Sequence, residues 1–239
     1  MDKILELQRM IDESQNIVFF GGAGVSTESN IPDFRSANGL YHEKYAYPPE
    51  QIVSHTFFVR KTALFYDFYK EKMMYLDAKP NAAHLKLAEM EATGKLKAVI
   101  TQNIDGLHQL AGSKKVLELH GSIHRNYCQK CGRFYEADYV KQSSAIPRCM
   151  CGGIIKPDVV LYEEGLDNDV IRKSIQAIAN ADMLIIGGTS LVVYPAAGFI
   201  DYFRGKYLVV INKSATAKEV GAHLTIQEPI GEVLGKIKV

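Results

Sequence analysis

Short apolar runs recur along the chain, and longer helix-compatible stretches separate them. Each run has the length of a buried strand, and each longer stretch has room for a helix. The runs lie at Ile17–Phe20, Ala98–Thr101, Val116–Leu119, Val159–Leu161, Met183–Ile186 and Tyr207–Ile211. This rhythm predicts an α/β fold, a doubly wound and mostly parallel sheet with helices on both faces.

The first predicted helix spans Met1–Ser14, where Ile4, Leu7 and Ile11 recur at helical spacing among acidic residues. Such an amphipathic pattern is not that of a signal peptide, and no apolar run approaches the ~20 residues of a membrane span. Further helices are predicted at Thr56–Tyr75, at Asn81–Thr93, at Asp167–Asn180 and from Pro195 onward.

Composition adds limits on partners and compartment. The chain has 239 residues and a net charge of +1, so nothing global attracts nucleic acid or an anionic membrane. Its four cysteines all fall between positions 128 and 151, which favours metal coordination in a reducing cytoplasm over a scattered disulfide framework. We therefore expect a cytoplasmic protein, and a monomer.

The cysteines form two close pairs, Cys128-x2-Cys131 and Cys149-x-Cys151, and a glycine follows each pair. Glycine permits the positive φ of a tight metal-binding knuckle. Four thiolates complete a tetrahedron and leave no open position for water, so the pattern predicts a structural Zn²⁺ site. A Cys149–Cys151 disulfide and a degenerate, weak metal site remain as alternatives.

A glycine turn follows the first apolar run and contains Gly22, Ala23, Gly24, Ser26 and Thr27. Its backbone N–H groups could face a pyrophosphate, although most short glycine runs are only tight turns and the third glycine of the usual dinucleotide fingerprint is missing. Three further segments, Gln102–Asp105, Leu119–Gly121 and Gly188–Leu191, also follow apolar runs. The carboxyl edge of an open α/β sheet binds ligands, so all four are expected at one site.

Together with the cysteine pairs, these segments resemble the sirtuin family of Sir2-type, NAD-dependent protein-lysine deacetylases, its bacterial-type members in particular. The resemblance covers nearly the whole chain from about Asn16. It implies a Rossmann-like domain of residues 1–120 and 158–239, a zinc-binding insert of residues 121–157, and a mobile cofactor-binding loop at residues 32–50. The commonest family spacing has two residues inside both cysteine pairs, and the lone Met150 departs from it.

The resemblance also implies the chemistry. The acyl-amide oxygen attacks the ribose carbon that bears nicotinamide, and nicotinamide leaves. His120 then acts as general base on the ribose hydroxyls, and the 2′-hydroxyl attacks the imidate carbon. Water finally releases free lysine and O-acetyl-ADP-ribose. Asn103 and Asp105 match family positions that handle the ribose and the nicotinamide amide. By itself, His120 could equally be a hydrogen-bonded core histidine, and an Asn-x-Asp pair is most often turn chemistry.

The implied NAD contacts extend beyond these catalytic residues to both sides of the sheet edge. They comprise Gly22, Ala23, Gly24, Ser26, Thr27, Asp33, Phe34, Arg35, Gln102, Asn103, Ile104, Asp105, His120, Gly188, Thr189, Ser190, Asn212, Lys213 and Ile230. Phe34 is expected to shield the reactive ribose carbon from water, because NAD hydrolysis is the competing reaction.

The peptide carrying the acyl-lysine is expected to pair as a strand with the segment Val160, Leu161, Tyr162 and Glu163. Relatives that prefer acidic acyl groups carry a Tyr-x-x-Arg pair. Its positions here match Tyr66 and Tyr69, so a short neutral acyl group, acetyl first, is predicted. The expected partners are acetylated proteins or peptides, with neither nucleic acid nor membrane.

Two other functions remain open. A protein mono-ADP-ribosyltransferase would use the same cofactor site, but it would not need the base step assigned to His120. A non-enzymatic NAD-sensing or adaptor module would not need the full set of polar residues at the cleft.

Overall fold

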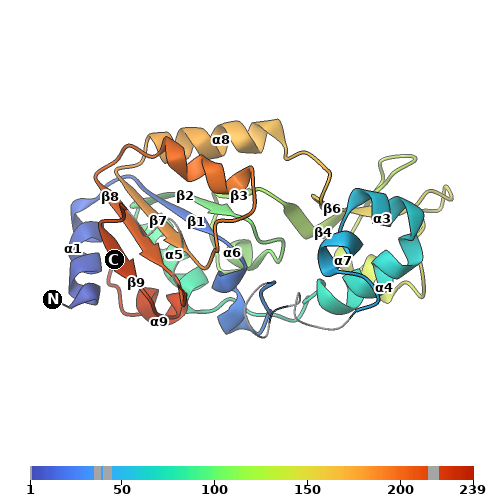
Figure 1. Ribbon diagram of the computed structural model, residues 1–239, viewed down its shortest axis with the longest axis horizontal. Helices are drawn as coiled ribbons and strands as arrows, with labels where there is room; N and C mark the ends of the chain where they lie inside the picture. The colour runs from blue at the N-terminus through green and yellow to red at the C-terminus, as the bar shows by residue number, and fades with distance from the viewer. Residues whose placement is uncertain (1, 35–38, 40–44, 215–220) are drawn as a thin grey trace.

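The computed structural model describes every residue except 1, 35–38, 40–44 and 215–220 (Figure 1). Its centre is a six-stranded sheet in the order β3-β2-β1-β7-β8-β9, with every neighbouring pair parallel. The strands are β1 (Ile17–Gly21), β2 (Leu96–Thr101), β3 (Val116–Glu118), β7 (Met183–Gly187), β8 (Tyr207–Ile211) and β9 (Leu224–Ile226). The strand order turns back at β1, which confirms the predicted doubly wound fold.

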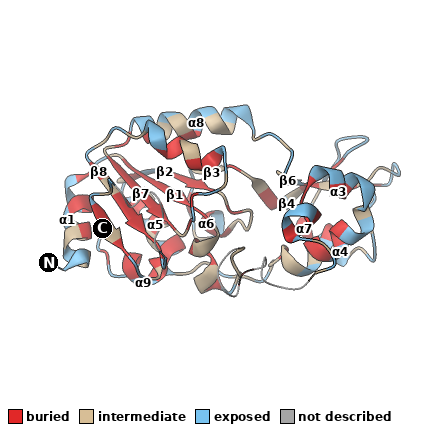
Figure 2. Cartoon of the chain, in the orientation of Figure 1, coloured by how far each residue is buried: buried red, intermediate tan, exposed pale blue. Residues whose placement is uncertain are grey.

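Alternate residues of the strands enter different hydrophobic cores. The strands of the large sheet are mostly buried (Figure 2). Phe19, Ile185 and Val209 pack on the face covered by α1 (Lys3–Glu13), α5 (Ala82–Ala92) and α9 (Ile230–Leu234). Val18 and Ile186 pack on the face covered by α8 (Asn168–Ala179) and the 3-10 helix η4 (Ala196–Tyr202). Both faces are buried, which explains why the strands are continuous apolar runs.

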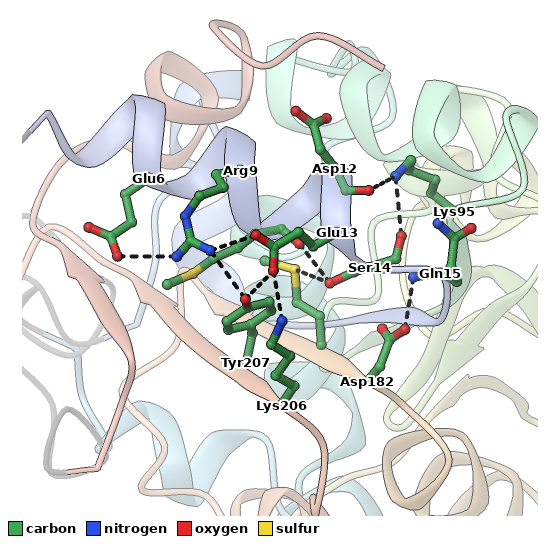
Figure 3. A network of polar contacts seen from close by, with 12 residues as sticks. Glu6, Arg9, Asp12, Glu13, Ser14, Gln15, Lys95, Asp182, Lys206 and Tyr207 are labelled. Carbon is green, nitrogen blue, oxygen red and sulfur yellow. Dashed lines mark hydrogen bonds and ion pairs between the residues drawn. The ribbon is translucent and has the colours of Figure 1, made fainter.

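Polar contacts fix the end of α1 against the sheet (Figure 3). Lys95 Nζ donates to the carbonyl oxygens of Ile11 and Asp12 at 2.8 and 2.9 Å, in the last turn of the helix, where carbonyls lack the usual partner four residues on. Lys206, with Tyr207 and Arg9, lowers the pKa of Glu13 to about 2. The first helix is thereby joined to β2 and β8 at the end of the sheet that lies away from the site.

A second, three-stranded antiparallel sheet has the order β5-β4-β6. Its strands are β4 (Gly121–Cys128), β5 (Phe134–Tyr135) and β6 (Ile155–Val159), and helix α7 (Ala137–Gln142) packs on it. The prediction of a strand of the main sheet at Val159–Leu161 is wrong. The strand ends at Val159 and pairs antiparallel with β4, with Gly121 opposite Val159. Val159 and Leu161 are buried in the core of the small sheet and not in that of the main sheet, which accounts for their apolar character.

The small sheet shares a hydrophobic core with helices that come earlier in the chain, α2 (Pro49–Ile52), α3 (His55–Arg60) and α4 (Thr62–Lys72). The single helix predicted at Thr56–Tyr75 is in fact two, and the break falls at Lys61, whose φ of −135° is not helical. The division of the chain into domains stays a prediction. The shared core shows that α2, α3 and α4 pack together with the predicted insert.

Across the described ranges of the chain, no helix combines the length and the apolar character that crossing a membrane would require.

Candidate functional site

A cavity of about 550 Å³ lies where the carboxyl ends of β1, β2, β7 and β8 face the small sheet. It brings together all the predicted cofactor and substrate residues except Arg35, which lies outside the described residues. Its predicted lining comprises Gly22, Ala23, Gly24, Ser26, Thr27, Asp33, Phe34, Gln102, Asn103, Ile104, Asp105, His120, Val160, Leu161, Tyr162, Glu163, Gly188, Thr189, Ser190, Asn212, Lys213 and Ile230.

The floor of the cavity depends on close backbone contact between two glycine turns. Gly24 N donates to Gly188 O at 2.8 Å, and a Cβ on Gly24 would lie 2.8 Å from Gly188 Cα. Gly188 has φ +59°, and a Cβ there would lie 2.3 Å from Val25 N. Only glycine at these positions lets the turns after β1 and β7 touch, so the sequence motif has a steric cause.

We expect Gly188→Ala to lower the free energy of unfolding by about 3 kcal/mol and to weaken dinucleotide binding, because both the backbone and its neighbour resist a side chain. Chemical denaturation and calorimetric titration would measure the two effects. Gly94→Ala is the matched control. Gly94 has φ +77° with open space around it, so only the backbone term of about 1 kcal/mol is expected. Equal effects of the two substitutions would contradict the steric argument.

A hydrogen-bonded chain links the glycine turn to the loop after β2. Asn103 Nδ2 donates to Ser26 Oγ at 3.0 Å, and Ser26 Oγ lies 2.6 Å from Asp105 Oδ2. Asp105 Oδ1 also accepts from the backbone N of Leu107, the first residue of α6 (Leu107–Leu110). The side chains of Asn103 and Asp105 are thus both bonded to Ser26, and Asp105 is bonded to the start of α6 as well.

A similar network ties the ends of β2, β7 and β8. Gln102 Nε2 donates to Thr189 Oγ1 at 3.0 Å, and Asn212 exchanges two hydrogen bonds with the Thr189 backbone at 2.9 and 3.1 Å. Lys213 Nζ lies 3.4 Å from Thr27 Oγ1, across the cavity wall. The polar groups after these strands therefore form a rigid rim and not a solvated loop.

His120 lies between β3 and β4, at the junction of the two sheets. Its Nδ1 is 2.9 Å from the carbonyl oxygen of Gln102, which can only accept, so Nδ1 carries the proton of the neutral ring. Burial lowers the pKa of His120, and the hydrogen bond to Gln102 opposes that change in part. The unprotonated Nε2 is therefore the form available near neutrality, and it can take a proton.

The four cysteines form one cluster, with all four sulfur atoms within 4.8 Å of one another. Cys128 Sγ is 3.5 Å from Cys151 Sγ, and Cys131 Sγ is 3.6 Å from Cys149 Sγ. A tetrahedral Zn²⁺ site places sulfurs about 3.8 Å apart, so the cluster fits zinc. All four thiols are free, which removes the disulfide alternative, and the shortened second pair still places both its sulfurs in the cluster.

The cavity is also lined by residues that the sequence did not indicate, among them Val53, Lys72, Met73, Tyr75, Val193, Tyr194, Pro195 and Glu228. Val53 is there because its carbonyl accepts from Tyr162 N at 3.0 Å, a pairing between segments far apart in the chain. A contact between residues so far apart in the chain cannot be predicted from a local sequence pattern. Val193 and Tyr194 follow the predicted Gly188–Leu191 segment directly, and an extension of that motif would have found them.

The profile of the Sir2 family matches residues 22–195, the stretch that contains the glycine turn, His120 and the cysteines. The chain belongs to the Sir2 family. The NAD-dependent protein deacetylase of Clostridium acetobutylicum is 64% identical over 98% of this chain and 97% of its own length. That of Clostridium perfringens is 62% identical over 99% and 98%.

Solved Sir2 structures agree in fold over nearly the whole chain. A Sir2 complex with a deacetylated p53 peptide and 3'-O-acetyl ADP ribose has a TM-score of 0.90 at 39% identity, covering 98% of this chain and 96% of that one. A Sir2 complex with a p53 peptide and NAD+ has a TM-score of 0.85 at 40% identity, covering 96% and 94%. Membership in the Sir2 family thus rests on the sequence and on the fold together.

Proposed function

We propose that this protein is an NAD-dependent protein-lysine deacetylase that yields nicotinamide, O-acetyl-ADP-ribose and free lysine. The observation that carries the proposal is the placement of His120, which lines the same cavity as the glycine turns with its Nδ1 proton already engaged. The two clostridial relatives named above carry the name of this activity, and they align with this chain over almost their whole length.

The cavity suits a dinucleotide. Gly22, Gly24 and Gly188 leave the floor without side chains, so backbone groups can approach a pyrophosphate closely. Thr189, Asn212 and Lys213 add hydroxyl, amide and ammonium groups on the β7 and β8 side. Asn103, Ile104 and Asp105 lie on the opposite side, nearer His120, where we place the nicotinamide and its ribose.

Bound NAD supplies an electrophilic ribose carbon once nicotinamide departs, and the residues of this chain control what reaches that carbon. Asn103 and Asp105, fixed through Ser26, orient the ribose. His120 Nε2 takes a proton from a ribose hydroxyl, and the Gln102 carbonyl stabilises the resulting imidazolium through Nδ1. Phe34 lines the cavity and excludes water from the reacting carbon.

The substrate peptide is proposed to lie along Val160–Glu163, between the two sheets. Tyr162 already pairs with Val53 and His55 through its own N and O, at 3.0 Å each, and Glu163 Oε2 accepts from Thr56 N at 2.8 Å. These bonds anchor the segment to the start of α3. A peptide strand would thus meet a segment that is already ordered, with less entropy left to lose on binding.

The preference for a short neutral acyl group stays a prediction, but it can no longer rest on the positions of Tyr66 and Tyr69. Tyr66 and Tyr69 are buried in the second core, and Tyr66 donates to Ile155 O, so neither lines the cavity. From α4 the cavity is lined by Lys72, with Met73 directly after it. Deacetylation is the activity in the names of the relatives, and it remains the activity that we propose first.

Activity is expected to fall on the acid side with a midpoint below 6.5, the ordinary pKa of histidine, because burial lowers the pKa of His120 and the base must be unprotonated. The pH dependence of kcat/KM for an acetyl-peptide would measure this. A midpoint clearly above 7 would show that His120 is not the group that titrates.

The decisive experiment incubates purified protein with NAD and an acetyl-lysine peptide and follows nicotinamide, free lysine and O-acetyl-ADP-ribose. Equal amounts of all three establish the deacetylase. Nicotinamide release with ADP-ribose on the peptide would instead identify a mono-ADP-ribosyltransferase. Binding of NAD without turnover would identify a sensor or adaptor.

We further propose a monomer in the cytoplasm, acting on acetylated proteins and not on nucleic acid. Four free thiols suited to zinc favour a reducing compartment, and a net charge of +1 provides no general attraction for nucleic acid.

A further inference from the structure

An arginine on β4 joins the two sheets around His120. Arg125 Nη1 donates to Glu118 Oε2 at 2.6 Å, and Arg125 Nε donates to Asp158 Oδ2 at 2.7 Å. Glu118 is the last residue of β3 in the large sheet, and Asp158 lies on β6 in the small sheet. His120 lies on the short link between β3 and β4, so the Arg125–Glu118 ion pair closes a ring of the chain that contains His120. The Arg125–Asp158 ion pair joins β6 to this ring.

Arg125 lies in an irregular part of β4. The β4–β6 register pairs Ser122 with Asp158 and then Asn126 with Pro157, so the residues from 123 to 125 bulge out of the ladder. Within the bulge, Ile123 N donates to Ile104 O at 2.9 Å, and His124 Nε2 lies 3.0 Å from Asp105 O. The bulge is therefore hydrogen-bonded to the backbone of the Asn103–Asp105 loop. Through Arg125 it is also bonded to β3, the strand that leads to His120.

Glu118 is the least exposed member of the ring. Its side chain is 10% exposed, against 38% for Arg125 and 44% for Asp158. The second oxygen of Glu118 accepts from Gln109 Nε2 at 2.8 Å, so the carboxylate also holds α6. Loss of Arg125 would leave one oxygen of the nearly buried Glu118 carboxylate without its partner. Such a loss costs more than the loss of an exposed surface ion pair, where water replaces the partner.

We propose that Arg125 is a positioning residue: it sets the orientation of β3, β4 and β6 so that His120 and Asp105 face the reacting ribose together. This inference rests on the proposed deacetylase function. His120 acts only after nicotinamide has left, and Arg125 ties together β3 and β4, the two strands that the link with His120 joins. Asp105, by contrast, is also held by Ser26 Oγ and by the backbone N of Leu107. Loosening the ring should therefore slow the later steps more than the first one.

The test compares two rates in the same preparation: deacetylation of an acetyl-peptide, and exchange of labelled nicotinamide into NAD in the presence of that peptide, which reports the first step alone. For Arg125→Met the ratio of deacetylation to exchange should fall about tenfold, since small misplacements of a catalytic group are costly. Arg125→Lys, which keeps the charge but loses the fork, should recover part of the ratio.

Arg172→Met is the control, because Arg172 pairs with Asp169 at 2.9 Å on the exposed side of α8 and should leave both rates unchanged. A ratio within about twofold of the wild type in both Arg125 variants would overturn the proposal. So would a parallel fall of both rates that follows a lowered Tm, which indicates general destabilisation. If the methionine variant does not fold, the lysine variant carries the test. Absence of both reactions in the wild type would instead refute the proposed function.

Discussion

Substitution of His120 by alanine is expected to lower deacetylation by about 10³-fold, within the range for loss of a positioned general base. Nicotinamide exchange should persist, because attack of the acyl oxygen on the ribose carbon requires no base. The fold should be retained, since His120 is only partly buried and, among the residues that the structure describes, its ring forms one hydrogen bond, to Gln102 O. Steady-state deacetylation and labelled-nicotinamide exchange would be measured side by side.

His223→Ala provides the matched control for the loss of an imidazole. His223 is exposed next to β9, where its ring accepts from Leu208 N and packs edge-on against Tyr207. It does not line the cavity, so activity should not change. Deacetylation by His120→Ala at more than about a tenth of the wild-type rate would rule out the general-base role.

Removal of zinc should have the largest effect on stability. Cys128 and Cys149 are buried in the second core, and structural zinc contributes on the order of 10 kcal/mol to the folding of small metal sites. We expect Cys128→Ser to lose the bound metal, to unfold the small sheet and with it the peptide segment, and to abolish activity. Metal content by mass spectrometry and thermal unfolding by circular dichroism would record both losses.

Met150→Ser tests whether such an effect is specific to the metal ligands. Met150 stands between Cys149 and Cys151 and is 88% exposed, so its replacement should leave zinc content and Tm unchanged. Full activity of a zinc-free Cys128→Ser protein would disprove the structural role of the metal.

The parallel sheet could be predicted because its strands are buried on both faces and therefore appear as unbroken apolar runs. The same rule failed for Val159–Leu161. There the apolar residues face the cavity and the second core, and pairing with β4 decides where the strand lies. The strand β9 was not predicted, because it is only three residues long and its two apolar residues, Leu224 and Ile226, do not form a run. Pairing with β8 and burial in the core decide that this short segment is a strand.

The candidate site followed from the sequence for a different reason: its residues come directly after strands, and strand ends converge by geometry. Gly24, Asn103 and Thr189 needed no knowledge of loop paths. Val53 and Arg125 did, since each acts through a partner far away in the chain. Contacts of that kind are visible only after the two sheets are placed against each other.

The position of β1 in the sheet has a consequence for synthesis of the chain. β1 pairs with β2 on one side and with β7 on the other, and the small sheet with its cysteines is made between those two partners. While the ribosome makes the small sheet, the buried strand β1 has an open edge of apolar residues, the kind of edge that pairs wrongly with other chains. From the emergence of β2 until that of β7, one edge of β1 therefore stays without its native partner.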